Sequence, residues 1–231
     1  MKGKLEHFEL KGRACACFVP ENGAQHLAVL CGWHMEEMLC ALAEEAPRTL
    51  LFFAEADGGR DFTPWAAEPV WENEPFLGGG AEYLRFLTET ALPYLEERYT
   101  LPPVPARRAI LGYSLGGLFA LWALCETKVF GQAASISGSM WYPGFSEYIR
   151  EHLPRKNQRV YLSLGDREPF GGPPALRAVG EKTEKIRELL EAQEREVFFE
   201  WNHGGHAKGV ENRWRKALRW TAAGFEREEG K

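Results

Sequence analysis

The sequence alternates between short apolar stretches typical of β-strands and longer stretches with apolar residues at helical spacing. Residues 49–56 (TLLFFAEA) and 107–114 (RRAILGYS) have the composition of strands covered on both faces of a sheet. Residues 35–46 and 81–99 have apolar residues at helical spacing instead. Because strands that alternate with helices form parallel crossovers, the pattern predicts an α/β fold with a mainly parallel sheet and helices on both faces.

The same alternation continues to the end of the chain. The other expected strands are residues 13–20, 26–33, 132–139, 159–166 and 196–205, and the other expected helices are residues 115–126, 174–194 and 212–225. No internal repeat, low-complexity tract or linker divides these elements. We therefore expect a single domain over residues 1–231.

Composition excludes several functions. The chain has 45% hydrophobic and 26% charged residues with a net charge of −5 and no basic run, so neither nucleic acid nor an anionic membrane is an expected partner. The uncharged run 109–125 contains three glycines and is too short to span a bilayer. The amino-terminal residues lack the apolar core of a secretory signal, and five cysteines without metal-site spacing suggest reduced thiols. These features predict a cytoplasmic protein.

One serine stands where an expected strand passes into an expected helix. Gly112-Tyr113-Ser114-Leu115-Gly116 has the pattern G-x-S-x-G, the nucleophile elbow of α/β-hydrolases. The two outer glycines remove side chains that would collide in so tight a turn. The turn presents the Ser114 hydroxyl at the positive end of a helix, with the Leu115 N–H available to an oxyanion. The alternative interpretation is a glycine-rich helix start.

A serine nucleophile needs a base, and in this fold the chain order is serine, acid, histidine. Of the histidines after Ser114, His152 falls in an apparent surface helix, whereas His203 and His206 follow the last expected strand. Gly204 and Gly205 would let the backbone bring His206 close to the serine. His203 could be a structural histidine, and a two-histidine metal site is a third alternative.

The acid is expected at the end of the preceding strand, in the stretch SLGDRE. Asp166 and Glu168 are both candidates there, and the sequence alone does not separate them.

Several segments resemble the Putative esterase family of α/β-hydrolases, which includes enterochelin-type siderophore esterases and esterase D. The resemblance covers about residues 28–220. It rests on the stretches GYSLGGLFALWAL, SGSMWYPGF, SLGDRE, GGHAKGVENRWRKALRW, RDFTPW and GGGAEYLRFL. It implies an α/β-hydrolase fold with a small loop lid.

The resemblance also implies site residues. The histidine of the family's G-G-H motif falls on His206, and the acid of its G-x-x-[DE] pattern falls on Glu168. The oxyanion loop, commonly H-G-x or D-G-x, corresponds to Cys31-Gly32-Trp33, so its backbone donor would be Trp33. A second departure is Ala207, where relatives commonly have phenylalanine.

The predicted function is hydrolysis of a carboxylic ester, in which an acyl group passes to Ser114 and then to water, without a metal or organic cofactor. The expected partner is a small-molecule ester or lactone; a siderophore lactone or an aromatic or small acyl ester would suit the family. An acyltransferase and a non-catalytic binding module on the same fold are the alternatives.

Residues expected over the site could contact the substrate or merely anchor their loops. Arg60 could pair with an anionic group of the substrate, and aromatic side chains could form its walls. The aromatic residues in question are Trp65, Trp71, Phe76, Trp141 and Tyr142.

Overall fold

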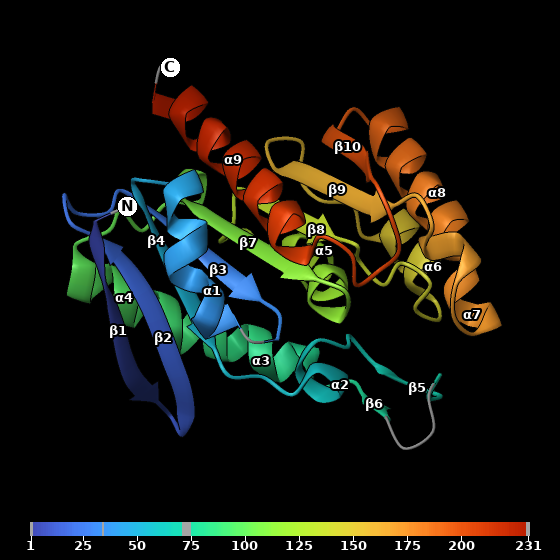
Figure 1. Ribbon diagram of the computed structural model, residues 1–231, viewed down its shortest axis with the longest axis horizontal. Coiled ribbons are helices and arrows are strands. Elements are labelled where there is room, and N and C mark those ends of the chain that lie inside the picture. Colours follow the sequence, from blue (N-terminus) through green and yellow to red (C-terminus); the bar gives the residue numbers. More distant parts are fainter. Residues whose placement is uncertain (1, 34, 71–74, 230–231) are drawn as a thin grey trace.

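The computed structural model describes residues 2–33, 35–70 and 75–229. Within them, an eight-stranded sheet has the order β1-β2-β4-β3-β7-β8-β9-β10 (Figure 1). β2 pairs antiparallel with β1 and β4, whereas the strands from β4 to β10 are parallel to one another. The strands are β1 (Gly3–Leu10), β2 (Arg13–Pro20), β3 (His26–Cys31), β4 (Thr49–Ala54), β7 (Arg108–Tyr113), β8 (Gln132–Ile136), β9 (Arg159–Gly165) and β10 (Glu196–Asn202).

Helices cover both faces of this sheet, as the alternation predicts (Figure 1). α1 (Met35–Leu42) and α9 (Val210–Glu229) pack on one face, with a 3₁₀ turn at Ala43–Glu45. The other face carries α3 (Gly80–Phe86), α4 (Leu92–Tyr99), α5 (Leu115–Glu126), α6 (Phe145–Glu151) and α8 (Val179–Ala192). Two short helices, α2 (Gly58–Asp61) and α7 (Pro174–Arg177), lie in connections. The α/β-hydrolase architecture is confirmed.

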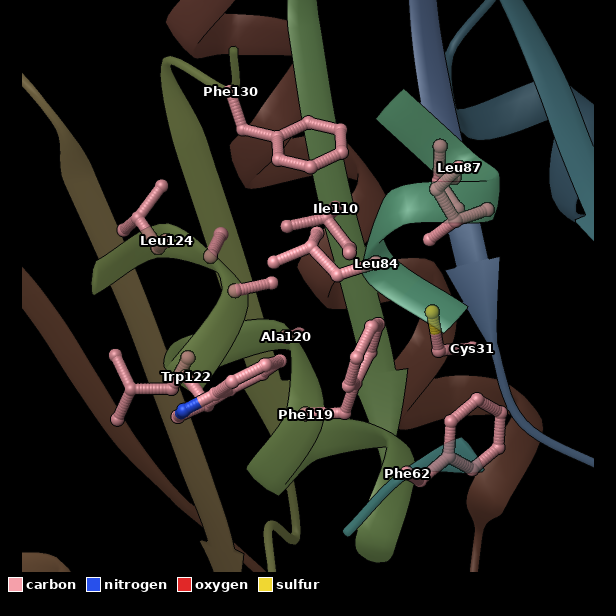
Figure 2. Packing of buried hydrophobic residues seen from close by; sticks show 14 of the residues in the cluster. Cys31, Phe62, Leu84, Leu87, Ile110, Phe119, Ala120, Trp122, Leu124 and Phe130 are labelled. Atoms are coloured by element: carbon pink, nitrogen blue, oxygen red, sulfur yellow. The ribbon is translucent and has the colours of Figure 1, made fainter. Parts of the chain in front are cut away.

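α5 lies at the centre of the larger core. All its residues from Leu115 to Leu124 are buried, so this helix is apolar on every side rather than amphipathic. Figure 2 shows Phe119, Ala120 and Trp122 of α5 packed beside Ile110 of β7 and Leu84 and Leu87 of the neighbouring helical segment. This dense packing fixes the beginning of α5, where Ser114 lies.

The structure differs from the sequence prediction at the amino terminus. β1 is an edge strand that was not predicted, because its residues alternate between exposed and half-buried and form no apolar run. The hairpin to β2 turns at Lys11 and Gly12, whose φ angles of 47° and 79° are those of a tight two-residue turn. The Lys-Gly pair was therefore the available signal.

The predicted helix over residues 81–99 is interrupted by a wide π-helical turn. Leu87–Ala91 forms this turn between α3 and α4. Pro93, the second residue of α4, follows the turn after Leu92, and its ring nitrogen cannot donate the hydrogen bond that a regular α-helix needs there. The chain remains helical on both sides.

The parallel strands end at one edge of the sheet and deliver their loops to the same place. In the register, Cys31 at the end of β3 lies opposite Gly112 of β7, and Ile136 at the end of β8 lies opposite Ser163 of β9. Residues 55–70 and 75–79 lie between β4 and α3 and contain the small hairpin of β5 (Ala66–Ala67) and β6 (Phe76–Leu77). Trp71 lies outside the described residues.

Candidate active site

Ser114 occupies a sharp turn between β7 and α5. Its φ and ψ angles are 59° and −121°, a strained conformation for a residue with a side chain. A Cβ at Gly112 would lie 1.9 Å from the Gly116 carbonyl oxygen, and one at Gly116 would lie 2.0 Å from the Cys31 carbonyl oxygen. Both glycines of the motif are therefore required by close backbone approach.

Backbone hydrogen bonds hold this turn from the neighbouring strand and loop. The Ser114 N–H donates to the Ile136 carbonyl at 3.1 Å, and the Ser139 N–H donates to the Ser114 carbonyl at 3.0 Å. The Leu115 N–H belongs to the first turn of α5, where N–H groups have no intrahelical acceptor. The serine hydroxyl thus stands at the positive end of a well-packed helix.

The structure brings three predicted residues into one hydrogen-bonded chain. His206 Nε2 lies 3.0 Å from Ser114 Oγ, and His206 Nδ1 lies 2.8 Å from Glu168 Oε2. Because an ionised carboxylate only accepts hydrogen bonds, Nδ1 carries the proton and Nε2 is the acceptor for the serine hydroxyl. This is the protonation pattern that a general base requires.

Glu168 is buried and ionised. Its side chain is 4% exposed, and its Oε1 accepts hydrogen bonds from the Gly165 N–H at 2.7 Å and from Arg213 at 2.6 Å. Burial by itself would raise the pKa of Glu168, but the hydrogen bond and charge of His206 and the Gly165 N–H outweigh it and lower the pKa. The imidazole therefore faces a carboxylate and not a carboxylic acid.

Asp166, the other candidate acid, holds the histidine loop instead of the imidazole. Its Oδ1 accepts the Gly204 N–H at 2.7 Å, and its Oδ2 lies 3.2 Å from His203 Nδ1. The Gly204 hydrogen bond is the main reason that the pKa of Asp166 is lowered. His203 thus pairs with an exposed acid, while His152 stacks on Tyr148 at the end of α6.

Two cavities meet at the serine. The smaller, about 220 Å³, has Trp141, Leu176 and Val179 as its apolar wall. The larger, about 590 Å³, is lined by Trp33, Phe76 and Leu77, together with Leu115. Ser114 and His206 line both cavities, so the hydroxyl and its base are accessible from either side.

Comparison with known proteins identifies the family. A family model described as Putative esterase matches residues 33–223. The chain belongs to this esterase family. It is accordingly a carboxylic-ester hydrolase.

Two Bacillus subtilis (strain 168) proteins are similar to the esterase in sequence. The uncharacterized protein YbbA is 29% identical over 206 residues, which is 82% of each chain. The ferri-bacillibactin esterase BesA is 30% identical over 162 residues, 64% of this chain and 55% of BesA.

Among solved structures, the siderophore hydrolase EstA from Aspergillus nidulans superposes with a TM-score of 0.73 at 17% identity, covering 96% of this chain and 94% of EstA. At that identity the likeness concerns the fold.

Of the aromatic residues predicted to lie over the site, two line the cavities at Ser114 and two hold loops together. Trp141 lines the smaller cavity and Phe76 the larger one. Trp65 donates from Nε1 to the Pro143 carbonyl at 2.9 Å, and the buried Tyr142 donates to the Trp65 carbonyl at 2.5 Å. These two bonds join the backbone and side chain of Trp65 to the loop after β8, so Trp65 and Tyr142 anchor loops.

Arg60 is directed to a different partner from the one proposed for it. Its guanidinium pairs with Glu82 at 2.8 Å, and among the described residues it lines neither cavity at Ser114. The structure therefore gives no support to a substrate contact by Arg60.

Trp33 lies at the position expected for the oxyanion loop, in the bend after β3. Its indole is half-exposed and packs over Gly58, where a Cβ would come within 2.9 Å of the ring. This places the residue at the wall of the larger cavity, beside Leu115 and Ser114.

Sequence reasoning missed Tyr113 and Arg213. The Tyr113 hydroxyl donates to the His206 carbonyl, and Arg213 on α9 reaches Glu168. The only available signal was an arginine next to Trp214 on the inward face of a helix, and that signal does not identify a partner.

No helix of the described residues is both long and apolar enough to cross a membrane. Within that part of the chain, no three His, Cys, Asp or Glu side chains are grouped so that they could hold a metal ion.

Proposed function

We propose that the esterase acts through a catalytic triad of Ser114, His206 and Glu168. The observation that carries this proposal is the continuous hydrogen-bonded chain from Ser114 Oγ through the imidazole to a buried carboxylate. A positioned base makes a serine hydroxyl nucleophilic, and the carboxylate orients the base and stabilises its cationic form.

In the first half-reaction, Ser114 Oγ forms a bond to the ester carbonyl carbon while its proton passes to His206 Nε2. The tetrahedral intermediate carries its negative charge on the former carbonyl oxygen. The N–H groups of Leu115 and Trp33 are the proposed donors to this oxyanion, and loss of one such donor typically costs about 3 kcal/mol of transition-state stabilisation. The carbon–oxygen bond to the alcohol then breaks, and the alcohol leaves with the proton of His206.

In the second half-reaction, water replaces the alcohol. His206 takes a proton from the water as its oxygen attacks the acyl carbon, and it returns that proton to Ser114 Oγ as the acid leaves.

For the substrate, we propose an ester or lactone with an aromatic or other apolar acyl group, siderophore lactones included. The apolar wall of the smaller cavity supports an apolar group on one side of the ester bond. BesA is a ferri-bacillibactin esterase and EstA a siderophore hydrolase, which supports siderophore esters as the first compounds to test.

The test is covalent labelling combined with a substrate panel. We expect a fluorophosphonate to label Ser114 in the wild-type protein and not in Ser114→Ala, as read by peptide mass spectrometry. Aryl esters, thioesters, lactones and ferric siderophores should separate the substrate classes by kcat/KM. Absence of labelling would contradict the triad, and a product that forms only with a second alcohol would indicate acyl transfer instead of hydrolysis.

A further inference from the structure

Arg213 is a fully buried cation that the proposed chemistry does not use directly. It lies in the first turns of α9, and its side chain is 1% exposed. A guanidinium keeps its charge in any protein environment, so burying it requires compensating partners. Its partners therefore indicate what it does.

Those partners all belong to the proposed triad or to the segments that position it. Nη1 donates to Glu168 Oε1 and to Ser137 Oγ, each at 2.6 Å, and approaches the Tyr113 hydroxyl at 3.3 Å. Nη2 donates to the Gly205 carbonyl at 2.8 Å. The guanidinium thus fixes both the acid and the residue that precedes His206.

Tyr113 completes the support of the histidine loop. Its hydroxyl donates a hydrogen bond to the His206 carbonyl. Arg213 and Tyr113 therefore bind the carbonyls of residues 205 and 206 respectively. His206 itself is half-exposed and contacts two cavities, which leaves its side chain without walls on those sides. Its position consequently depends on its backbone, on Glu168 and on the Tyr113 ring, whose centroid lies 5.4 Å from that of the imidazole.

The charges are arranged as a cation, an anion and a titratable imidazole in series. Glu168 offers Oε1 to Arg213 and Oε2 to His206. Arg213 offsets part of the carboxylate's charge, so the imidazolium is stabilised less than it would be by an isolated carboxylate. The other titratable or charged groups around this series are Tyr113, Arg167 and Lys208, with the Asp166–His203 pair on the outer side of the loop.

We propose that Arg213 is a positioning residue of the esterase. By binding Glu168 and the Gly205 carbonyl together, Arg213 holds the carboxylate and the His206 loop in place relative to each other, and its charge moderates the basicity of His206. This proposal rests on the triad proposed above. A lysine in place of Arg213 would keep the charge but not the planar fork that reaches Glu168 and Gly205 together. A glutamine would keep hydrogen-bonding capacity but lose the charge.

The experiment compares Arg213→Lys and Arg213→Gln with the wild-type esterase. We expect kcat to fall about 10–100-fold in both variants with little change in KM, because the loss concerns the alignment of the base and not substrate binding. We expect the acidic limb of the kcat/KM profile to move to higher pH, by on the order of one unit, only in Arg213→Gln. Lysine should leave that limb in place.

A second readout does not depend on turnover. The imidazole resonance of His206, assigned with His206→Gln, should titrate at higher pH in Arg213→Gln than in the wild type. If the wild-type protein hydrolysed no ester, the proposed function would fail while this titration still tested Arg213. If the titration and the kcat of Arg213→Gln matched the wild type, Arg213 would only be packing and the proposal would be wrong.

The matched control is Arg159→Gln, which removes a largely buried arginine from the opposite end of the strand that leads to Glu168. It should change neither kcat nor the pH profile. Should Arg213→Gln fail to fold, the kinetics of Arg213→Lys test the proposal by themselves. A kcat loss of about tenfold or more at unchanged KM would support the proposal, and a wild-type kcat would overturn it.

Discussion

Both ends of the parallel sheet hold a buried arginine–glutamate pair, but the two pairs have different neighbours. At the carboxyl end, Glu168 divides its oxygens between Arg213 and His206. At the amino end, Glu96 of α4 binds Arg108 of β7, and both side chains are 11% exposed. The first pair touches a titratable ring that faces two cavities; the second is part of the packing between a helix and the sheet. The contact with an imidazole, and not the buried ion pair itself, therefore distinguishes the carboxyl end of the sheet.

Cavity size does not distinguish the two ends. A cavity of about 510 Å³ lies at the amino end between the beginnings of β8, β9 and β10, comparable to the larger cavity at Ser114. The described residues that line it include no serine or histidine. A third cavity of about 570 Å³ is lined mainly by residues of β1 and β2. Volume alone therefore does not select the site at Ser114, whereas the side-chain chemistry does.

Removing the proposed nucleophile should have the largest effect on activity. We expect Ser114→Ala to lower kcat about 10⁶-fold toward p-nitrophenyl esters, because the base then has no hydroxyl to activate. Asn157→Ala, in the amino-end cavity, should retain wild-type kcat. Substantial turnover by Ser114→Ala in steady-state assays would place the chemistry elsewhere.

The two acids of the loop after β9 provide a finer test. We expect Glu168→Gln to lower kcat about 10⁴-fold, because the amide no longer stabilises the imidazolium. Asp166→Asn should lower kcat less than about tenfold, since it changes only the loop contacts to Gly204 and His203. Steady-state kinetics on both variants would measure this, and the reverse ranking would assign the acid to Asp166.

The amino-end pair should affect stability and not activity. We expect Arg108→Gln to lower the free energy of unfolding by about 3–5 kcal/mol, because Glu96 would remain buried without its cation. Urea unfolding followed by tryptophan fluorescence gives this value. The kcat of the folded fraction should equal that of the wild type; a large loss of kcat would mean that the two ends are coupled.

A more exposed carboxylate should have the smallest effect. Hydrogen bonds from Arg98, Lys4 and Tyr99 lower the pKa of Glu6 on β1 from 4.5 to about 2. Since the folded-state pKa is the lower one, this stabilisation is complete above pH 4.5 and is lost as pH falls toward 2. We expect Glu6→Gln to lower the unfolding free energy by about 1 kcal/mol at pH 7 and less at pH 3, as measured by urea unfolding at both values. An equal effect at both pH values would contradict this assignment.

Local signals in the chain predict much of the fold. The strand Arg13–Pro20 and the helix Leu115–Glu126 were predicted with the bounds that the structure has, because apolar periodicity and flanking turns are properties of neighbouring residues. The unusual turn at Ser114 was likewise predicted, since the glycines that it requires lie within two residues of the serine in the sequence. β1 was missed because an edge strand with one solvated face has no apolar run.

Local sequence patterns are sufficient to predict a parallel sheet flanked by helices and one serine at a strand-to-helix turn. The family resemblance already favours Glu168 over Asp166 as the acid, but the contacts of Glu168 with His206, of Arg60 with Glu82 and of Arg213 with Glu168 are visible only in the folded chain. These pairings join segments 22 to 45 residues apart in the chain. Their partners are set by strand register and loop packing, to which a residue's immediate neighbours in the sequence contribute little.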